Sequence, residues 1–480
     1  MKGMFTVPKR LLLLLVVWIW CFSIFAQNLG NRTYIEDRPL MYFSSVLCHD
    51  SIYEIIGGTR DKSGANFTRL LSVEINSQGQ ITSCESFFDS TAASYGAFYN
   101  SAIGNDKNEL YYTGYAVDTE ARLLLFKKEL LIDSVTIYQY STPNSYAFQG
   151  YKMIQVGSDY FVSGVHTDLT INSANIILVK IDSVGNRIWQ KYYGLSNRIE
   201  YAKSLILLDN GHLMLGGLRN DFNQTNEQSN TWLLEVDTGG QIMRQWFDLS
   251  DSTYAAEGLL QTLDSGFVYG AGKKAFESGG LVATTATIVK MGNGFNKQWT
   301  FNDGFRSLYT EIRDIEQLPD GSFIACGQKP FYHQDSTIIS GWIVKLTSGG
   351  SVVWNRVYTG VDSTNVLNFL NDIDVLPDGS LVAVGQCQRS GHTPPQVGWF
   401  LKLDSNGCEV ENCLVGIDET PKENLIQVYP NPFTTDLQIA LTGEHVTNAT
   451  FTITNTIGQT IYRQTESNLA TGYAKMLDLS

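Results

Sequence analysis

A β-hairpin pattern recurs along the chain, and this internal repeat constrains the fold more than any other feature of the sequence. The clearest copies are 341–354 and 177–189, in which apolar and polar residues alternate on both sides of a glycine-containing turn. Alternation with a period of two, interrupted by a glycine that adopts positive φ without strain, is typical of a β-hairpin. Further copies lie at 232–246, 287–299 and 399–413, and weaker ones at 71–87 and 126–140.

A second kind of hairpin lies between these copies. It is clearest at 314–327 and 372–385, where the turn is Asp-Gly, a strong short-range hairpin signal. Each second strand of this kind ends in a triplet that contains glycine. The seven triplets are 57–59, 113–115, 163–165, 216–218, 270–272, 326–328 and 384–386.

Two hairpins per repeat give four strands per repeat. From Gly58 to Gly385 the chain advances 327 residues in six intervals, or about 54 residues per unit. Four-stranded units that repeat at about this length are typical of β-propeller blades. We therefore predict an all-β fold with a seven-bladed β-propeller over residues 27–415; six or eight blades are the alternatives.

A series of tryptophans repeats with the outer hairpins. Trp189, Trp299 and Trp354 occupy one aligned position, and Trp246 lies two residues away on the same strand face. One binding site rarely needs the same residue from several blades, whereas large aromatic side chains dominate contacts between sheets. We expect these tryptophans to pack between blades.

The N-terminus has the pattern of a secretory signal peptide. Three basic residues occur within the first ten, an apolar run covers 11–25, and Ala26 and Gln27 follow at the expected cleavage position. The run is shorter than the roughly 20 residues of a membrane-spanning helix, and no other run of that length follows. We predict a signal peptide at 1–26, export, and no transmembrane segment after its removal.

Composition excludes several classes of partner and cofactor. The chain has 34 Lys and Arg against 48 Asp and Glu, and the mature part has no cluster of cations that could bind a nucleic acid backbone. Of the six cysteines beyond the signal peptide, only Cys408 and Cys413 are close enough in sequence to suggest a disulfide. Scattered histidines provide no metal-binding pattern, and turn aspartates bond their own backbone. We expect no metal or cofactor.

A different pattern begins after a charged linker at 416–424. It comprises 428–433 (Val-Tyr-Pro-Asn-Pro-Phe), an alternating strand at 436–441, and a pair of strands around an Ile-Gly-Gln turn at 451–462. These short strands predict a small β-sandwich over 425–480.

The motifs of this module resemble the C-terminal sorting domain of the type IX (Por) secretion system. The resemblance implies that the secretion machinery is a partner and that the protein travels through the periplasm to the cell surface or the medium. Members of that family continue beyond the position of 477–480 into two further strands, so the resemblance implies a truncated module. The propeller repeats also resemble uncharacterised repeats that precede such domains.

The innermost strands of a propeller line its central funnel, and counting back from each turn glycine identifies their candidate residues. These are Lys203, Arg313, Asp314, Asn371 and Asp372. Asp314 and Asp372 are the carboxylate pair that a hydrolase would need. They could equally be residues at the beginning of their strands, at a solvent-exposed edge of the propeller.

No catalytic motif accompanies these residues, and the sequence leaves enzymatic activity undecided while favouring none. Irregular insertions at 220–230 and 329–338 vary between blades and favour a surface or secreted scaffold that binds protein or glycan. The alternative is a secreted polysaccharide hydrolase or lyase that acts at the funnel.

Overall fold

A computed structural model describes the following residues: 30–34, 40–49, 52–60, 67–88, 91–105, 108–132, 134–143, 145–168, 173–195, 198–220, 229–249, 255–276, 282–304, 310–333, 336–361, 366–391, 393–409, 426–429, 436–441, 446–454, 460–469 and 474–478. Every regular element in these ranges is a β-strand, so the all-β prediction is confirmed. They contain no helix of the length and apolarity needed to cross a membrane. The chain divides into two compact units, Met1–Cys413 and Leu414–Ser480. The predicted signal peptide at 1–26, the linker at 416–424 and Cys413 lie outside the described residues.

Strands of the first unit that are neighbours in sequence pair antiparallel in groups, which we number as blades. Single parallel bridges at Ala121/Ala147, Ala174/Ile199 and Ile339/Leu367 connect some neighbouring groups. Blade 1 contains β2 (Met41–His49), β3 (Ile52–Arg60), β4 (Thr68–Asn76) and β5 (Ile81–Phe87). Blade 2 contains β6 (Ser94–Gly104), β7 (Glu109–Val117), β8 (Ala121–Glu129) and β9 (Ser134–Tyr140). Blade 3 contains β10 (Ser145–Val156), β11 (Asp159–Asp168), β12 (Ser173–Ile181) and β13 (Arg187–Tyr193). Blade 4 contains β14 (Ile199–Leu207), β15 (Leu213–Asn220), β16 (Ser229–Val236) and β17 (Ile242–Phe247). Blade 5 contains β18 (Glu257–Gln261), β19 (Phe267–Phe276), β20 (Val282–Met291) and β21 (Lys297–Asn302). Blade 6 contains β22 (Glu311–Gln317), β23 (Phe323–His333), β24 (Ser336–Leu346) and β25 (Val352–Tyr358). Blade 7 contains β26 (Val366–Val375), β27 (Leu381–Arg389), β28 (Gln396–Leu403) and the N-terminal β1 (Gly30–Tyr34).

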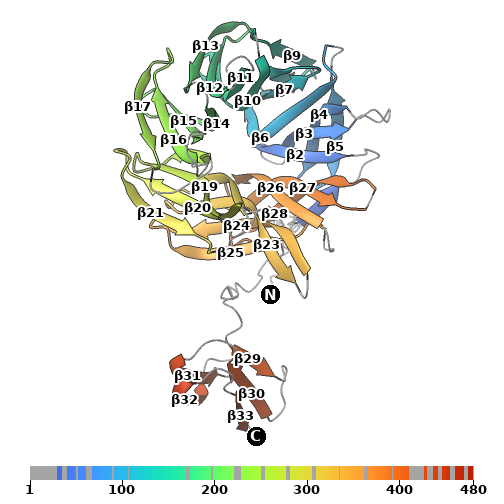
Figure 1. Ribbon diagram of the computed structural model, residues 1–480. Coiled ribbons are helices and arrows are strands. Elements are labelled where there is room, and N and C mark those ends of the chain that lie inside the picture. Colours follow the sequence, from blue (N-terminus) through green and yellow to red (C-terminus); the bar gives the residue numbers. More distant parts are fainter. Residues whose placement is uncertain are drawn as a thin grey trace, which may run out of the picture. The chain divides into compact units, whose positions relative to one another are not determined.

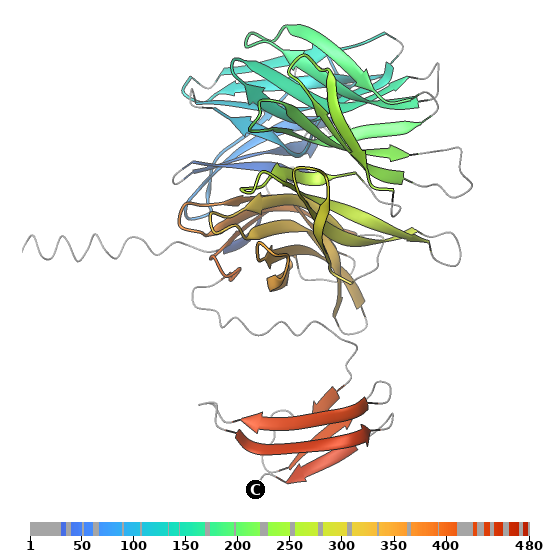
Figure 2. The ribbon, with the colours of Figure 1, turned by 90° about the vertical axis from the view of Figure 1, so that its left-hand side faces the viewer.

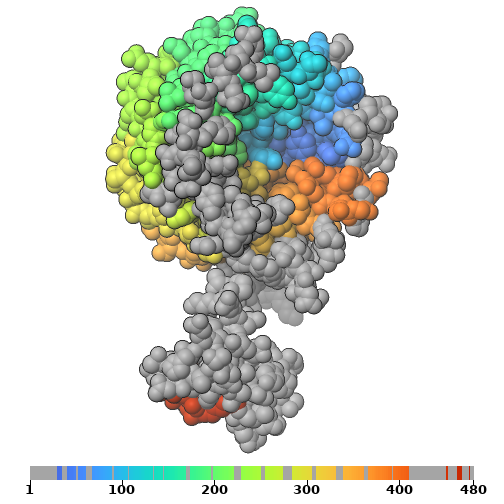
Figure 3. Space-filling model, viewed as in Figure 1, coloured from blue at the N-terminus to red at the C-terminus, as the bar shows by residue number. Residues whose placement is uncertain are grey.

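The two ends of this unit meet in blade 7. Strand β1 pairs antiparallel with β28, so residues 30–34 supply the outermost strand of the last blade. Figure 1 shows the blades arranged in a ring, and Figure 2 shows the same ring from the side. In the space-filling view the blue N-terminal blade lies directly beside the orange C-terminal blade (Figure 3), and Phe43, Val382 and Phe400 share one buried core between them. This arrangement is a β-propeller closed by its own N-terminus.

Every innermost strand carries an irregularity in its pairing with the second strand of the blade. The register shifts lie at Phe43/Ser45, Ala97/Ala102, Gly150/Lys152, Ala202/Ser204, Glu257/Leu260, Ile312/Asp314 and Leu370/Asp372. The glycine triplets of the second strands lie opposite these irregularities. A Cβ at Gly164 would fall 1.9 Å from the Gln149 carbonyl oxygen, and one at Gly385 would fall 1.8 Å from that of Phe369. The repeated glycines are therefore required because the bulged strand approaches too closely for a side chain.

The outer strands hold each blade to the next one. Four tyrosine hydroxyls donate to a turn-glycine carbonyl of the following blade: Tyr34 to Gly79 at 2.7 Å, Tyr140 to Gly185 at 2.8 Å, Tyr193 to Gly240 at 2.8 Å and Tyr358 to Gly407 at 2.7 Å. The indoles of Trp189, Trp299 and Trp354 cover the turn glycines Gly240, Gly350 and Gly407 in the same direction. The tryptophan series therefore packs between blades, as its repetition predicts.

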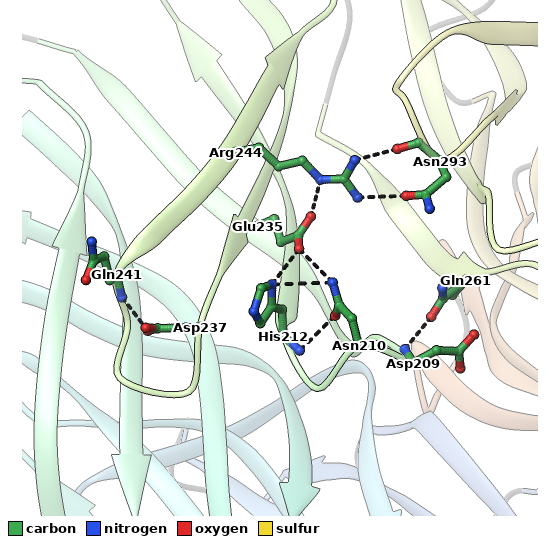
Figure 4. A network of polar contacts seen from close by, with 9 residues as sticks. All are labelled: Asp209, Asn210, His212, Glu235, Asp237, Gln241, Arg244, Gln261 and Asn293. Atoms are coloured by element: carbon green, nitrogen blue, oxygen red, sulfur yellow. Dashed lines mark hydrogen bonds and ion pairs between the residues drawn. The ribbon is translucent and has the colours of Figure 1, made fainter.

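A polar network also links blade 4 to blade 5 (Figure 4). The buried Glu235 carboxylate accepts hydrogen bonds from His212 at 2.7 Å and Asn210 at 3.1 Å, and it contacts Arg244. Arg244 in turn donates to the side chain of Asn293 in the next blade at 2.9 Å. Burial opposes ionisation of Glu235, but these donors outweigh it and lower its pKa. The network stabilises the ring at a distance from its centre.

One predicted insertion is regular structure. Residues 329–338 were expected to form an irregular loop, but β23 and β24 pair continuously as far as His333 and Ser336. Phe331, Tyr332, Thr337 and Ile338 favour the extension, because aromatic and β-branched residues are enriched in strands. Of the insertion predicted at 220–230, the structure describes Asn220, which pairs with Ser229, and Asn230, which pairs with Arg219, whereas 221–228 lie outside the described residues.

The second unit consists of two small sheets. One has the order β29 (Ile426–Tyr429), β30 (Asp436–Leu441) and β33 (Ala474–Asp478), and the other pairs β31 (Val446–Thr454) with β32 (Thr460–Leu469). All of these pairings are antiparallel. Strands therefore form where the alternating pattern at 436–441 and 451–462 predicts them.

Candidate functional site

The bulges of the innermost strands determine which side chains point toward the centre of the propeller. A bulge leaves a residue out of the pairing ladder and changes the direction of its side chain. The residues left out are Ser44, 98–101, Tyr151, Lys203, 258–259, Arg313 and Asn371. Three of the five funnel candidates, Lys203, Arg313 and Asn371, are therefore equivalent residues of blades 4, 6 and 7.

Five innermost strands surround one cavity of about 470 Å³. These strands are β6, β10, β14, β18 and β22, of blades 2 to 6. Lys203, Arg313 and Asp314 are among its lining residues, whereas Asn371 and Asp372 are not. We call these five strands the open side of the channel, and the strands β2 and β26 of blades 1 and 7 the sealed side.

A cluster of charged groups lies against this cavity. Lys203 contacts the Glu257 carboxylate and lies 3.8 Å from Glu311, whose other oxygen is 2.8 Å from the Arg313 guanidinium. The Arg313 guanidinium also lies over the ring of Tyr99, 3.9 Å from its centroid. Two cations and two carboxylates therefore balance one another in a partly buried site.

The two carboxyl groups of this cluster titrate differently. Burial raises the pKa of Glu257 to about 7 against the opposing charge of Lys203. Burial would also raise the pKa of Glu311, but the charges of Arg313 and Lys203 outweigh it and the pKa is lowered. The cluster is therefore charge-balanced while Glu257 is ionised and gains a positive charge when Glu257 takes up a proton.

The β6 bulge crosses the channel and forms one wall of the cavity. Asn100, at φ 48°, contacts the Asp314 carboxylate and accepts a 2.6 Å hydrogen bond from Lys152 on its carbonyl oxygen. Phe98 meets Tyr151 edge to face, with ring centroids 4.2 Å apart. A non-glycine residue at positive φ carries strain, so these contacts from blades 3 and 6 are what holds the bulge in place.

Apolar side chains form most of the remaining wall. They are Ile103, Met153, Ile154, Leu205, Ile206, Leu207, Leu259, Leu260 and Ile315. Leu207 is 43% exposed, so this wall reaches the outside of the propeller at the turn of blade 4. The cavity thus combines an apolar surface with aromatic edges, the charged cluster of Lys203, Glu257 and Arg313, and a second polar group formed by Asn100, Lys152, Asp314 and Glu316.

On the sealed side, the equivalent polar groups are used for contacts between blades. The Asn371 amide donates to the Phe43 carbonyl at 2.7 Å, and the Asp372 carboxyl accepts from the Val46 amide at 2.7 Å. Asp314 accepts from the Ile373 amide at 3.3 Å and shares a hydrogen bond with Asp372. All three side chains are at most 5% exposed. These residues join blades 6, 7 and 1.

Burial controls the protonation of the Asp314–Asp372 pair. It raises the pKa of Asp372 well above the ordinary value, and the neighbouring Asp314 charge adds to the effect. Burial also raises the pKa of Asp314, with Lys152 opposing it. Two carboxyl groups in hydrogen-bond contact share one proton, since both cannot remain ionised at such a distance.

Metal binding has no support in the described part of the chain, which contains no group of three or more His, Cys, Asp or Glu placed to hold an ion. Cys408 is disulfide-bonded, while its predicted partner Cys413 lies outside the described residues. Cys48, Cys326 and Cys387 are free thiols.

Sequence reasoning missed several residues of the cavity and of the charged cluster beside it. Glu257 and Glu311 precede the bulges of β18 and β22, and Tyr99 and Asn100 belong to the longer bulge of β6. The glycine triplets could have located the bulges, because each glycine faces one. The length of the β6 bulge had no repeat to indicate it.

Comparisons with known proteins agree with both units. Residues 427–480 match the family described as secretion system C-terminal sorting domain. Similar solved structures include a polysaccharide lyase of family PL25, an ulvan lyase, at 10% identity and a TM-score of 0.51, covering 78% of this chain and 95% of that one. The polysaccharide lyase Uly1 has 9% identity and a TM-score of 0.48 over 79% and 100% of the two chains. The β-propeller domain of the Trilobed protease from Pyrococcus furiosus has 9% identity and a TM-score of 0.39 over 75% and 94%.

At these identities the likeness concerns the fold alone. No curated protein sequence matches the chain significantly. The predicted resemblance of the C-terminal module is confirmed by the family match, which marks the protein for secretion or the outer surface and implies contact with the secretion machinery. Residues 427–480 therefore belong to the type IX (Por) secretion system C-terminal sorting domains, carried by a β-propeller protein.

Proposed function

We propose that this protein is an exported binding propeller that holds a neutral glycan in the cavity on the open side of its channel. The observation that carries the proposal is the composition of that cavity: about 470 Å³ lined by five strands, with aromatic rings beside a charge-balanced cluster. Concave, mostly apolar cavities with a few convergent polar groups are the usual form of ligand sites.

A sugar matches this chemistry. Its hydroxyl groups donate and accept hydrogen bonds, as the ion pairs of Lys203 and Arg313 require, while its C–H faces pack on rings such as Tyr99 and Tyr151. Above about pH 7 a charged ligand is less suitable, because the ionised Glu257 and Glu311 then neutralise both cations. Binding a charged group would break one of these pairs and leave a buried charge uncompensated.

Hydrolysis by Asp314 and Asp372 is poorly supported. Glycosidases place their carboxyl groups about 5–5.5 Å or about 6.5–9.5 Å apart, to leave room for the sugar or for a water. Asp314 and Asp372 instead share a hydrogen bond, and Asp372 is 5% exposed. A polysaccharide hydrolase or lyase remains the second candidate only through an unassigned catalyst on the open side.

The route of export completes the proposal. We propose cleavage between Ala26 and Gln27, passage through the periplasm, and a disulfide between Cys408 and Cys413 that closes the end of the propeller. Mass spectrometry of the secreted protein, with and without reduction, would identify the new N-terminus and the linked cysteines. A mature chain that starts elsewhere would contradict the cleavage site.

Binding can be tested by filling the mouth of the cavity. Leu207 lines it and is 43% exposed, whereas Leu263 is 72% exposed on the equivalent turn of blade 5 and does not line it. Calorimetric titration with neutral oligosaccharides should show binding to the wild type and to Leu263→Trp, and at least tenfold weaker binding to Leu207→Trp. Equal affinity of the two variants, or no binding of any oligosaccharide to the wild type, would overturn the proposal, and turnover by the wild type would favour the enzyme.

A further inference from the structure

A second, smaller hollow of about 220 Å³ lies between blades 5 and 6. Its lining residues are Ala255, Glu257, Ala271, Gly272, Thr284, Thr310, Glu311 and Ile312. We call it the side niche. Glu257 lines both the side niche and the channel cavity, so the carboxylate stands at the junction of the two spaces.

One residue that lines the side niche carries a buried hydroxyl group that lacks a partner. Thr310 is 2% exposed, and its Oγ1 has no hydrogen-bond partner among the residues that the structure describes. The backbone of Thr310 is held in place, because its carbonyl oxygen accepts a hydrogen bond from the Thr284 hydroxyl at 3.2 Å. A buried hydroxyl without a partner costs free energy, and a ligand atom in the niche would satisfy it.

The other polar groups of the niche are already oriented. Gln328 donates to Glu311 at 2.9 Å, and Arg313 holds the same carboxyl oxygen at 2.8 Å. Ala255 and Ala271, which are 2% and 4% exposed, also line the niche and provide a small apolar surface. The niche therefore offers a hydroxyl, a carboxylate and a patch of methyl groups within one small volume.

We propose that the side niche binds the acetamido group of an N-acetylated amino sugar whose ring occupies the channel cavity, an inference that rests on the proposed glycan binding. The acetamido carbonyl accepts from the Thr310 hydroxyl, its N–H donates to the Glu257 carboxylate, and its methyl group packs against Ala255 and Ala271. Each part of this group thus meets a matching part of the wall.

Other substituents match the niche less well. A carboxylate or sulfate would face Glu257 and Glu311, and like charges repel. An ammonium group gains little, because Lys203 and Arg313 already neutralise these carboxylates, and it has no acceptor for the Thr310 proton. A single hydroxyl group has no methyl to place against the two alanines.

The test compares three trisaccharides with the same β-1,4-linked backbone that differ only at carbon 2: triacetylchitotriose, its fully deacetylated form and cellotriose. Calorimetric titration of the full chain at pH 7.5 should give at least tenfold tighter binding of the acetylated sugar than of either other ligand. The comparison needs no variant, so it does not depend on the folding of a mutant.

A variant then assigns the preference to the niche. Thr310→Val keeps the shape of the side chain and removes its hydroxyl, so the preference for the acetylated sugar should fall to less than threefold while cellotriose affinity stays unchanged. Equal binding of all three sugars by the wild type would overturn the acetamido proposal and leave glycan binding intact. So would an unchanged preference in Thr310→Val, whereas failure of every neutral oligosaccharide to bind would overturn the proposed function itself.

Discussion

The open and sealed sides of the channel use the same position of the repeat for different purposes. On the open side, bulge residues such as Tyr151, Lys203 and Arg313 face a cavity. On the sealed side, Asn371 occupies the equivalent place in β26, but its side-chain amide donates a hydrogen bond to the Phe43 carbonyl of the next blade. The repeat thus provides one geometry, and the distance to the neighbouring blades decides whether a polar side chain faces the cavity or a backbone group.

This difference separates stability from binding within one ring of equivalent residues. Substitutions on the sealed side should remove hydrogen bonds that join blades, because the groups there are buried and paired. Substitutions at the mouth or wall of the cavity should leave the fold intact. The following predictions test that separation.

The largest effect on stability is expected for Asp372→Ala. The substitution leaves the buried Val46 amide without an acceptor and removes the hydrogen bond with Asp314. Two buried groups lose their partner, so the free energy of unfolding should fall by about 2–4 kcal/mol, measured by urea denaturation. Asp378→Ala, in an exposed turn where Asp378 accepts from the Ser380 amide at 2.8 Å, should cost less than about 1 kcal/mol. Equal losses in the two variants would refute the structural role of the sealed side.

Equivalent bulge residues should respond differently on the two sides. Asn371→Ala leaves the buried Phe43 carbonyl unpaired and should cost about 1–3 kcal/mol. Tyr151→Phe removes a hydroxyl group on the cavity wall and should change stability by less than about 0.5 kcal/mol. Thermal denaturation of both variants measures the difference, and a Tyr151→Phe loss as large as that of Asn371→Ala would show that the open side is also structural.

Glu316 allows a test by pH, because it lines the cavity next to the sealed side. Burial, together with the charges of Asp314 and Asp374, raises its pKa from 4.5 to about 8. A carboxyl group with a raised pKa in the folded state stabilises the fold below pH 4.5, and this contribution is lost as the pH rises toward 8.

The variant Glu316→Gln cannot ionise, so its stability should lack this loss. The difference in unfolding free energy between wild type and variant should shift in favour of the variant by about 1 kcal/mol between pH 4.5 and pH 8, after allowance for solvent screening. Urea denaturation at several pH values measures it. A constant difference across that interval would mean that Glu316 is solvated and ionised throughout.

The smallest effect is expected for the tyrosine hydrogen bonds between the outer strands of neighbouring blades. Their loss should cost the same on the open and the sealed side. Tyr193→Phe removes a hydrogen bond between blades 3 and 4, and Tyr34→Phe removes the corresponding one between blades 7 and 1. Each should cost about 0.5–1 kcal/mol in chemical denaturation. A much larger cost for Tyr34→Phe would indicate that closure by β1, rather than the inner bulges, makes the sealed side different.

Local pattern was sufficient for the strands and their order. The alternation around Gly185 and Gly350 predicted the outer hairpins, and the Asp-Gly turns at Gly321 and Gly379 predicted the inner ones. Residues 329–338 were misjudged as a loop because β23 and β24 pair beyond the point where most of the other described hairpins end. Strand formation there depends on pairing with the facing residues, which a repeat comparison does not detect.

The site could be predicted only in part. Counting along the repeat identified Lys203 and Arg313, because each precedes its turn glycine by the same number of residues. It also nominated Asp314 and Asp372 as a pair, and the two do meet, but in a buried hydrogen bond rather than across a cavity. Their separation depends on how closely β22 and β26 approach, which is a property of two different blades.

The sequence by itself determined the repeat, the strand order, the tryptophan packing and the sorting domain, since each of these depends on residues that are close in the chain or on a motif. Tertiary structure alone decided that blades 2 to 6 leave a cavity, that β1 closes blade 7, and that Glu257 stands between the channel and the side niche. The physical reason is that a repeat specifies how a chain pairs within one blade, whereas the space at the centre of the ring depends on side chains from five blades at once.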